Sequence, residues 1–282
     1  MRYSRLLLAG NHALLMVFAL LMLVPFGYMF LSAFRVGGDN GPALFEWSAH
    51  GPDVHWEYIT PANFIRLFEE PHIVRALLNS IFLSSVTSLG ATLVAAMGGY
   101  ALSKFPFRGR EPLTALVLGA LVIPAPLLIA PGYQWLYQLN LLDTYSGMII
   151  PAIGSAFGVF LFRQAMINSV PDDLIAAARI DGAGEMHIFF GLVVPLVRPM
   201  IGAFLMIMFL GVWNNFITPQ VVMQSPEMFP LSVAINNLRG LYGTDSGLII
   251  AGTFVSVAPV LCLFLLLQRE FISGLTSGAL KG

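Results

Sequence analysis

Six long windows without a single charged side chain constrain this chain more than any other feature. Each window reaches or approaches the ~20 apolar residues that a helix needs to cross the hydrocarbon core of a bilayer. Hydrophobic residues make up 57% of the 282 residues and charged residues only 10%, a balance that indicates a polytopic membrane protein. We therefore predict an all-α membrane protein with one domain over residues 1–282, and with spans at about 8–34, 77–103, 113–136, 146–166, 196–217 and 247–268.

The basic residues outside these windows predict the orientation of the chain. With the N-terminus in the cytoplasm, ten Lys and Arg residues fall on the cytoplasmic side and four on the outer side, as the positive-inside rule requires. The first uncharged window, 6–34, is longer than the apolar core of a cleaved signal peptide, so we expect a retained first helix and two cytoplasmic termini. Pro124, Pro126 and Pro131 predict a break in the third span.

Several classes of function find no support in the sequence. A single cysteine, Cys262, excludes an internal disulfide and a cysteine-based metal site. The net charge of −1 and the lack of basic runs give no indication of a nucleic-acid partner. No P-loop, HExxH or nucleophile-elbow motif occurs, so we expect no catalytic residue, no metal, no bound cofactor and no ATPase site in this chain.

The most organised polar segment is the connector at 169–191. Pro171, Asp172 and Asp173 make a helix start, with carboxylates that can cap free amides near the positive end of the helix dipole. The alanine-rich stretch that follows favours helix, and Gly182 ends it, after which residues 185–190 can begin a second short helix. Such a connector is either a solvated turn or a docking surface for a soluble partner, and we interpret it as a docking surface.

Several separated segments carry a family resemblance. In the connector, Ala177 and Ala178 are followed after three residues by Gly182 and further on by Pro195, which is the pattern of an "EAA" loop. Four more segments add to the resemblance, at 78–80, 99–105, 213–216 and 268–282. Together they resemble the MalG-type permease subunits of carbohydrate ABC importers. One departure is Ala176, which stands where the family has the glutamate of "EAA".

The resemblance implies the type I permease fold of ABC importers, with six spans and cytoplasmic coupling helices. It also implies a multi-pass inner-membrane protein that translocates a sugar or oligosaccharide. The implied partners are a second, MalF-like permease subunit, two ATPase subunits that use ATP and Mg, an extracytoplasmic solute-binding protein and membrane lipid. The residues implied to dock on the ATPase are Asp172, Asp173, Leu174, Ala177, Ala178, Asp181, Gly182, Ala183 and Pro195, and those of the tail implied to lie near it are Gly274, Leu275 and Thr276.

Polar and aromatic side chains in or next to the spans are candidates for a solute path, because polar groups are costly in a membrane. They are Asn79, Ser84, Tyr133, Trp213, Asn214 and Asn215. Hydrogen bonding between packed helices and, for Tyr133, an interfacial aromatic belt remain open as alternatives. The rival functions are a self-contained secondary transporter or channel and a scaffold subunit. A secondary transporter predicts ionisable residues inside spans, of which the sequence has almost none.

Overall fold

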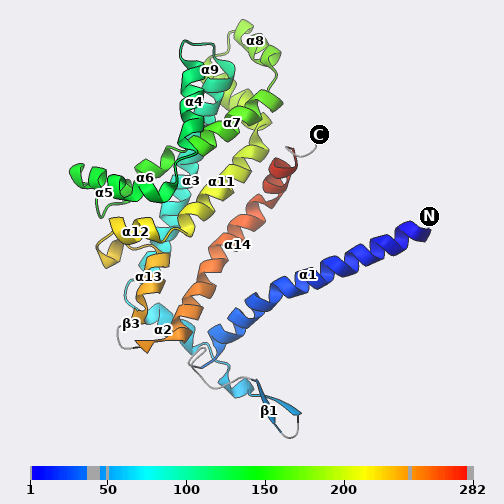
Figure 1. Cartoon of the computed structure of the whole chain (residues 1–282), viewed down its shortest axis with the longest axis vertical. Coiled ribbons are helices and arrows are strands. Elements are labelled where there is room, and N and C mark those ends of the chain that lie inside the picture. The colour runs from blue at the N-terminus through cyan, green and yellow to red at the C-terminus, as the bar shows by residue number, and fades with distance from the viewer. Residues whose placement is uncertain (1, 37–44, 49–50, 241–242, 278–282) are drawn as a thin grey trace. The chain divides into compact units, whose positions relative to one another are not determined.

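The computed structural model describes residues 2–36, 45–48, 51–240 and 243–277, and helices dominate them (Figure 1). Two short antiparallel hairpins lie in connectors. One pairs β1 (Phe45–Ser48) with β2 (Gly51–Val54), and the other pairs β3 (Arg239–Gly240) with β4 (Gly243–Thr244). The predicted all-α membrane class is confirmed by the helices and by their apolar length.

The long apolar helices follow the uncharged windows of the sequence, and shorter helices form in the connectors. In chain order they are α1 (Arg2–Phe34), α2 (Ala62–Glu69), α3 (Ile73–Lys104), α4 (Arg110–Ala120), α5 (Ile129–Gln138), α6 (Tyr145–Ile153), α7 (Ala156–Ser169), α8 (Asp172–Ile180), α9 (Glu185–Ile188), α10 (Val194–Leu196), α11 (Arg198–Trp213), α12 (Ile217–Val222), α13 (Leu231–Asn237) and α14 (Ser246–Ser277). Short turns of other helix types are η2 (Trp56–Tyr58), η3 (Ala125–Leu128), the π-helical η4 (Phe189–Val193) and η5 (Pro226–Met228).

Four stretches of the described chain are long and apolar enough to span a membrane as they stand: Leu7–Phe34, Ile73–Lys104, Tyr145–Ser169 and Ser246–Glu270. Two bent pairs bring the number to six if each counts as one span. The pair Arg110–Ala120 and Ala125–Gln138 bends by 99°, and the pair Glu185–Leu196 and Arg198–Trp213 by 83°. The first bend falls at Pro124, because proline lacks an amide donor and disfavours helical geometry in the residue before it. The break that the prolines predict is thus present, and it divides the predicted third span into two helices, α4 and α5.

The chain divides into two compact units. The first contains residues up to Val74 together with Ile235–Ala258, and the second contains Arg75–Ala234 and the residues from Pro259 onward. The helix α14 contributes to both units. The assignment of residues 1–282 to one domain stays a prediction.

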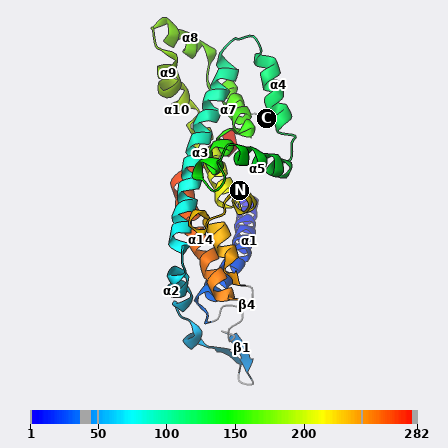
Figure 2. The same cartoon turned by 90° about the vertical axis from the view of Figure 1, so that its left-hand side faces the viewer.

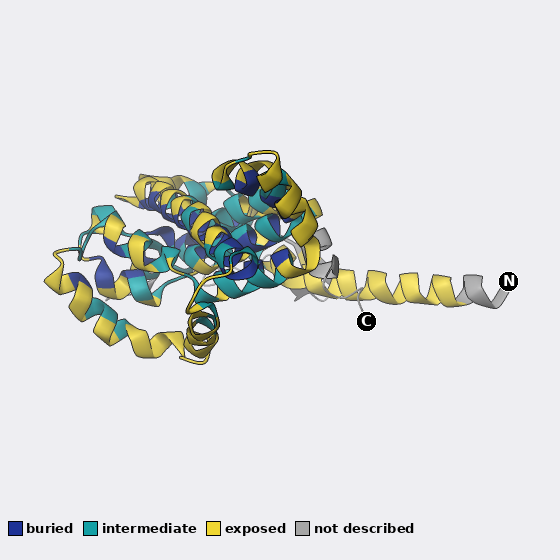
Figure 3. Ribbon diagram, turned by 90° about the horizontal axis from the view of Figure 1, so that it is seen from above, coloured by how far each residue is buried: buried dark blue, intermediate teal, exposed yellow. Residues whose placement is uncertain are grey.

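In the first unit, an aromatic cluster and one buried amide hold the end of α1. Phe30, Phe34, Phe64 and Phe254 pack in a series with ring centroids 4.7–6.0 Å apart. The buried amide of Asn63 donates hydrogen bonds to the carbonyl oxygens of Ala33 and Arg35, at 2.9 and 2.8 Å. The rest of α1 from Leu7 is exposed along nearly its whole length (Figure 3). Such an exposed apolar helix is suited to contact with lipid or another membrane chain.

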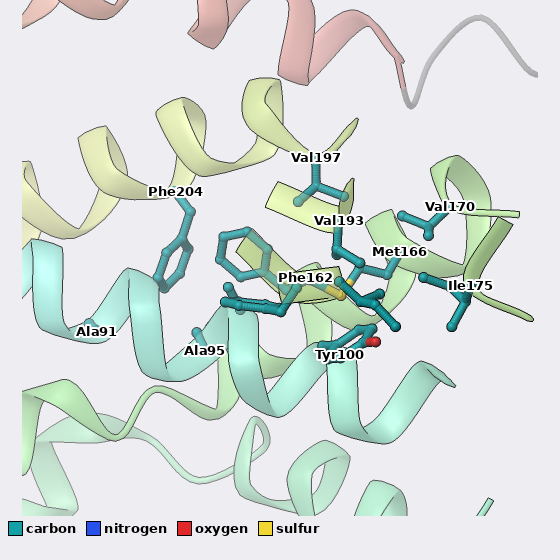
Figure 4. Close-up of a cluster of buried hydrophobic side chains, with 13 residues drawn as sticks. Ala91, Ala95, Tyr100, Phe162, Met166, Val170, Ile175, Val193, Val197 and Phe204 are labelled. Carbon is teal, nitrogen blue, oxygen red and sulfur yellow. The ribbon is translucent and has the colours of Figure 1, made fainter. Parts of the chain in front are cut away.

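In the second unit, α3 packs closely against α7. At Gly99, an added Cβ atom would lie 2.6 Å from Cβ of Phe162 and 2.7 Å from the backbone nitrogen of Arg163. Only glycine permits this approach of the two backbones. A buried cluster extends from this contact to α11 and to the connector after α7 (Figure 4), and its labelled members are Ala91, Ala95, Tyr100, Phe162, Met166, Val170, Ile175, Val193, Val197 and Phe204.

Candidate functional site

The connector at 169–191 folds into two helices joined by a tight turn, α8 and α9, which we call the hook (residues 172–188). The helix α8 begins at Asp172 directly after Pro171, whose ring cannot supply an amide donor to a preceding helix. Asp172 and Asp173 occupy its first turn, where the helix dipole favours negative charge. The predicted side-chain cap is wrong: the N-cap position makes no side-chain hydrogen bond, and Asp172 pairs with a lysine on α3.

Gly182 ends α8 as the sequence predicts. Its φ of 80° lies in the left-handed region, which glycine adopts without steric cost. The amide of Ala183 donates to the carbonyl of Ala178 at 3.0 Å, and the amide of Gly182 donates to the carbonyl of Arg179 at 3.1 Å. This pair of hydrogen bonds is the Schellman arrangement, and it turns the chain sharply into α9.

One polar contact joins the two helices of the hook to each other and to α3. The carboxylate of Glu185 accepts hydrogen bonds from Arg179 Nε at 2.7 Å and from the Tyr100 hydroxyl at 2.9 Å. The guanidinium of Arg179 also lies 5.3 Å from the ring centroid of Phe105, close enough for a cation–π contact. Hydrogen bonding and charge from Glu185 raise the pKa of Arg179 above its ordinary value despite partial burial.

A second polar contact fixes the start of the hook. Lys104 Nζ, whose side chain is 5% exposed, donates to the carbonyl of Val170 and to the carboxylate of Asp172, both at 2.6 Å. The hydrogen bond from Lys104 and its positive charge lower the pKa of Asp172. Both ends of the hook are therefore tied to the last turn of α3. Figures 1 and 2 show α8 and α9 at the end of the unit where α3 terminates.

The hook buries one face and exposes the other. Ile175 and Ile188 insert into the cluster of Figure 4 and are 2% and 0% exposed. Two apolar side chains face outward instead, Ile180 at 86% exposure and Met186 at 61%. A solvated turn would not be expected to carry large apolar side chains this exposed next to a rigid scaffold, so this face is suited to a partner surface.

The predicted docking residues fall into three groups. Those exposed on the hook are Asp172, Asp173, Leu174, Ala177, Asp181 and Gly182. Ala178 and Ala183 are half-buried and pack against the chain's own core, and Pro195 is exposed but lies in α10, beyond the hook. Sequence reasoning did not single out Tyr100, Lys104, Glu185, Ile180 or Met186. The i, i+6 spacing of Arg179 and Glu185 across a glycine turn is the signal that could have indicated one of these contacts.

Most of the predicted path residues have structural partners. The Asn79 amide donates to the carbonyls of Glu227 and Phe229, at 2.9 and 3.0 Å, and accepts from the Tyr145 hydroxyl at 2.7 Å. The ring of Trp213 is 6% exposed and stacks on Phe209. Both side chains therefore have structural partners, and their place on a solute path stays a prediction.

The remaining path candidates differ in exposure. Asn215 accepts a hydrogen bond from the Thr218 amide, whereas Asn214 is exposed. Ser84 is buried, and its hydroxyl has no hydrogen-bond partner among the described residues. Tyr133 lines a hollow of about 320 Å³ whose other lining residues are Tyr137, Asn140, Leu142, Asp143 and Gln224.

Of the predicted tail residues, the structure describes only the backbone, in the last turns of α14: Gly274, Leu275 and Thr276. Residues 278–282 lie outside the described chain. The nearest described side-chain contact is that of Glu270, whose carboxylate accepts a hydrogen bond from Arg198 at 3.0 Å and links α14 to the start of α11. Among the described residues, no group of three or more His, Cys, Asp or Glu side chains could hold a metal ion.

Comparison with solved structures identifies the fold. A bacterial ABC transporter involved in the import of the acidic polysaccharide alginate matches with a TM-score of 0.80 over 96% of this chain and 98% of that chain, at 22% identity. The fold is therefore that of ABC importer permeases.

Sequence comparison identifies relatives among characterised permeases. The arabinooligosaccharides transport system permease protein AraQ of Halalkalibacterium halodurans is 39% identical over 225 residues, which are 79% of this chain and 80% of that protein. The lactose transport system permease protein LacG of Rhizobium radiobacter is 31% identical over 76% of this chain and 78% of that protein. The family model of the binding-protein-dependent transport system inner membrane component matches residues 95–269, a range that contains the hook. The chain therefore belongs to the family of inner-membrane components of binding-protein-dependent transport systems.

Proposed function

We propose that this chain is the permease subunit of an ATP-driven importer for a sugar or oligosaccharide. The relatives AraQ and LacG, named for arabinooligosaccharides and lactose, support a carbohydrate substrate. A solved structural neighbour is an alginate ABC transporter in complex with a saccharide-bound periplasmic protein, which supports delivery of substrate by a binding protein. The distribution of basic residues supports cytoplasmic termini.

The hook is the coupling element in this proposal. Its apolar outer face, with Ile180 and Met186, seats on an ATPase subunit, and its inner face is bound to α3 through Lys104 and Glu185. A rigid element tied to a spanning helix transmits the movement of its partner as a rigid-body shift, which alternating access between two helix packings requires. This rigid attachment, combined with an exposed apolar face, is the observation that carries the proposal.

The other partners follow from the same arrangement. A second, MalF-like permease chain completes the pore, and two ATPase subunits bind ATP and Mg, since this sequence contains no P-loop. The seat formed by Ala177 and Gly182 replaces any ion pair from the glutamate of "EAA", because Ala176 stands at that position. The tail at Gly274, Leu275 and Thr276 extends toward the ATPases.

Affinity purification of the tagged chain in mild detergent, with mass spectrometry of what co-purifies, tests the proposal. We expect a P-loop ATPase and a second multi-span chain. The variant Met186→Asp should lose the ATPase and keep the second permease chain, because a charge on the apolar face opposes docking. Trp56→Asp, which places the same charge at a 69% exposed apolar side chain in the connector between α1 and α2, is the control and should retain both partners. Purification of the chain alone as a stable homo-oligomer would favour a secondary transporter or channel.

A further inference from the structure

The hollow beside Tyr133 joins two connectors that lie far apart in sequence. One links α5 to α6, and the other follows α12. Asp143 ties them together: its carboxylate accepts hydrogen bonds from the backbone amides of Gln224 and Ser225, at 2.9 and 3.0 Å, and from the Ser225 hydroxyl. The amide of Asp143 donates to the carbonyl of Val222 at 3.0 Å. The wall of the hollow is therefore fixed by hydrogen bonds.

The backbone around the hollow is unusual in two places. Asn140 and Asp143 have φ values of 54° and 55°, and together with His72 they are the non-glycine residues with positive φ in the described chain. Asn and Asp tolerate this region better than most residues, but it is still sparsely populated. Both residues lie in the connector between α5 and α6, and both line the hollow. Conformations of this kind cluster at ligand sites.

The lining side chains offer unused hydrogen-bonding capacity. Within the described chain, no hydrogen bond is formed by the side-chain amides of Asn140 and Gln224 or by the hydroxyls of Tyr133 and Tyr137. Tyr133 and Tyr137 lie one helical turn apart on α5 and so share a face of that helix. The hollow thus combines two aromatic rings, two amides and a carboxylate around Leu142.

This combination matches the chemistry of a neutral saccharide. Amides donate to and accept from neighbouring hydroxyls, and aromatic rings pack on the apolar face of a sugar ring. The volume of about 320 Å³ is at the lower end of the range of roughly 300–1,000 Å³ for ligand pockets, which suits one end of a saccharide better than a long chain. No lysine, arginine or histidine is among the described residues that line the hollow, and Asp143 contributes a negative charge, which disfavours an anionic ligand.

We infer that the hollow is a subsite for a neutral saccharide, formed by Tyr133, Tyr137, Asn140 and Gln224 and made selective against acidic sugars by Asp143. This inference rests on the proposed function. In the predicted topology, both connectors face the outer side, opposite the hook, so the subsite would meet the saccharide as the binding protein releases it.

Saturation-transfer difference NMR on the assembled importer in lipid nanodiscs, without the binding protein, tests the subsite. The probes are arabinotriose, which is neutral, and trigalacturonate, an acidic trisaccharide of similar length. We expect transfer to the arabinotriose ring protons, little transfer to trigalacturonate, and an apparent affinity at least about tenfold weaker in the double variant Tyr133→Ala/Tyr137→Ala, as follows from loss of the stacking surface.

One control variant, two variants of subsite residues and a stability measurement separate binding from folding. Trp135→Ala removes an exposed aromatic ring on the same helix that does not line the hollow, and it should keep the signal. Tyr137→Phe keeps the ring and removes the hydroxyl, so any loss of signal measures what that hydroxyl contributes to binding. Asp143→Asn should raise the signal of trigalacturonate relative to arabinotriose. Thermal unfolding midpoints of all variants identify any that fail to fold.

The outcomes distinguish this inference from the proposed function. An importer that takes up a neutral saccharide in vesicles, but whose NMR signal is unchanged in a stably folded double variant, overturns the subsite alone. Preferential transfer to trigalacturonate in the native importer also overturns it. An importer that takes up no saccharide overturns the proposed function together with the subsite.

Discussion

The hook and the hollow, both in the second unit, use carboxylates in opposite ways. In the hook, Glu185 and Asp172 are paired with the cations Arg179 and Lys104, so their charges are compensated. At the hollow, Asp143 is held by two backbone amides and a hydroxyl, with no cation among its hydrogen-bond partners in the described chain. The first arrangement fixes a rigid, charge-balanced element. The second fixes a loop beside an open hollow and leaves the negative charge of Asp143 without a neutralising cation.

The largest loss of stability is expected where the backbones of α3 and α7 touch, in the part of the second unit that carries the hook. Gly99→Ala places a Cβ against the backbone of Phe162 and Arg163, which cannot move without separating α3 from α7. We expect a loss of about 1–3 kcal/mol in the free energy of unfolding, measured by thermal unfolding in detergent. Gly119→Ala is the matched control, because nothing lies within 4 Å of its added Cβ. Equal midpoints for the two variants would contradict the close packing.

Removal of the Glu185 carboxylate, which Arg179 and Tyr100 share, should weaken the coupling of transport to ATP hydrolysis more than it weakens binding of the ATPase. Glu185→Ala leaves Arg179 and the Tyr100 hydroxyl without their common acceptor, and we expect a loss of about 1.5 kcal/mol, the lower end of the range for charged hydrogen bonds, because Glu185 is 43% exposed. Transport per ATP hydrolysed should fall more than ATPase binding, because the hook remains but is no longer fixed to α3. Glu185→Gln retains an acceptor and should recover part of the coupling. If Glu185→Ala transports as much per ATP hydrolysed as the native chain, the contact of Glu185 with α3 is not required for coupling.

At the hollow, truncation of a carboxylate to alanine should destabilise one connector and leave the coupling of transport to ATP hydrolysis unchanged. Asp143→Ala leaves the amides of Gln224 and Ser225 without an acceptor, with an expected cost of about 1–2 kcal/mol. The hydrogen bond from Ser225 lowers the pKa of Asp143. Its stabilising contribution is therefore present above its unfolded pKa of about 3.9 and is lost as the pH falls through the lower folded pKa. The difference in unfolding midpoint between the native chain and Asp143→Ala should shrink below about pH 4. An unchanged difference down to about pH 2 would refute this role.

The smallest loss of stability is expected at the ion pair between Asp172 and Lys104, because Asp172 is exposed. The pKa of Asp172 is lowered by Lys104, so the sign is the same as for Asp143: stability is gained above the unfolded pKa and lost on acidification. Because the Asp172 side chain is 85% exposed, Asp172→Asn should cost only about 0.2–1 kcal/mol. High salt should reduce this cost but not that of Asp143→Ala, whose partners are uncharged. Equal salt sensitivity of the two variants would remove the contrast between the two regions.

Much of the fold could be predicted because its signals are local. Uncharged windows of span length predict the apolar helices, Pro124 predicts the break between α4 and α5, and Gly182 predicts the end of α8. Each rests on the chemistry of neighbouring residues alone. The local signals also gave one wrong detail, the cap at Asp172, because the lysine that takes this carboxylate is 68 residues away.

The candidate sites were predicted only in part, because their decisive contacts connect distant segments. The motif residues Ala177 and Gly182 indicated the hook, but Tyr100 lies 85 residues before Glu185, and no periodicity connects them. Tyr133 was a candidate, yet the hollow also requires Gln224, which Asp143 holds in place across 81 residues. Asn79 was a path candidate from its polarity, and its place on a path stays a prediction; its partners at 227 and 229 lie about 150 residues away in the sequence and could not be predicted from it.

By itself, the sequence determined that this chain is a helical membrane protein with a structured polar connector, since hydrophobicity, proline and glycine act within a few residues. Only the tertiary structure decided which carboxylates pair with a cation, as Asp172 and Glu185 do, and which one binds backbone amides, as Asp143 does. Hydrogen bonds and ion pairs act over about 3 Å in space, without regard to distance along the chain. They can be assigned only once the helices have packed.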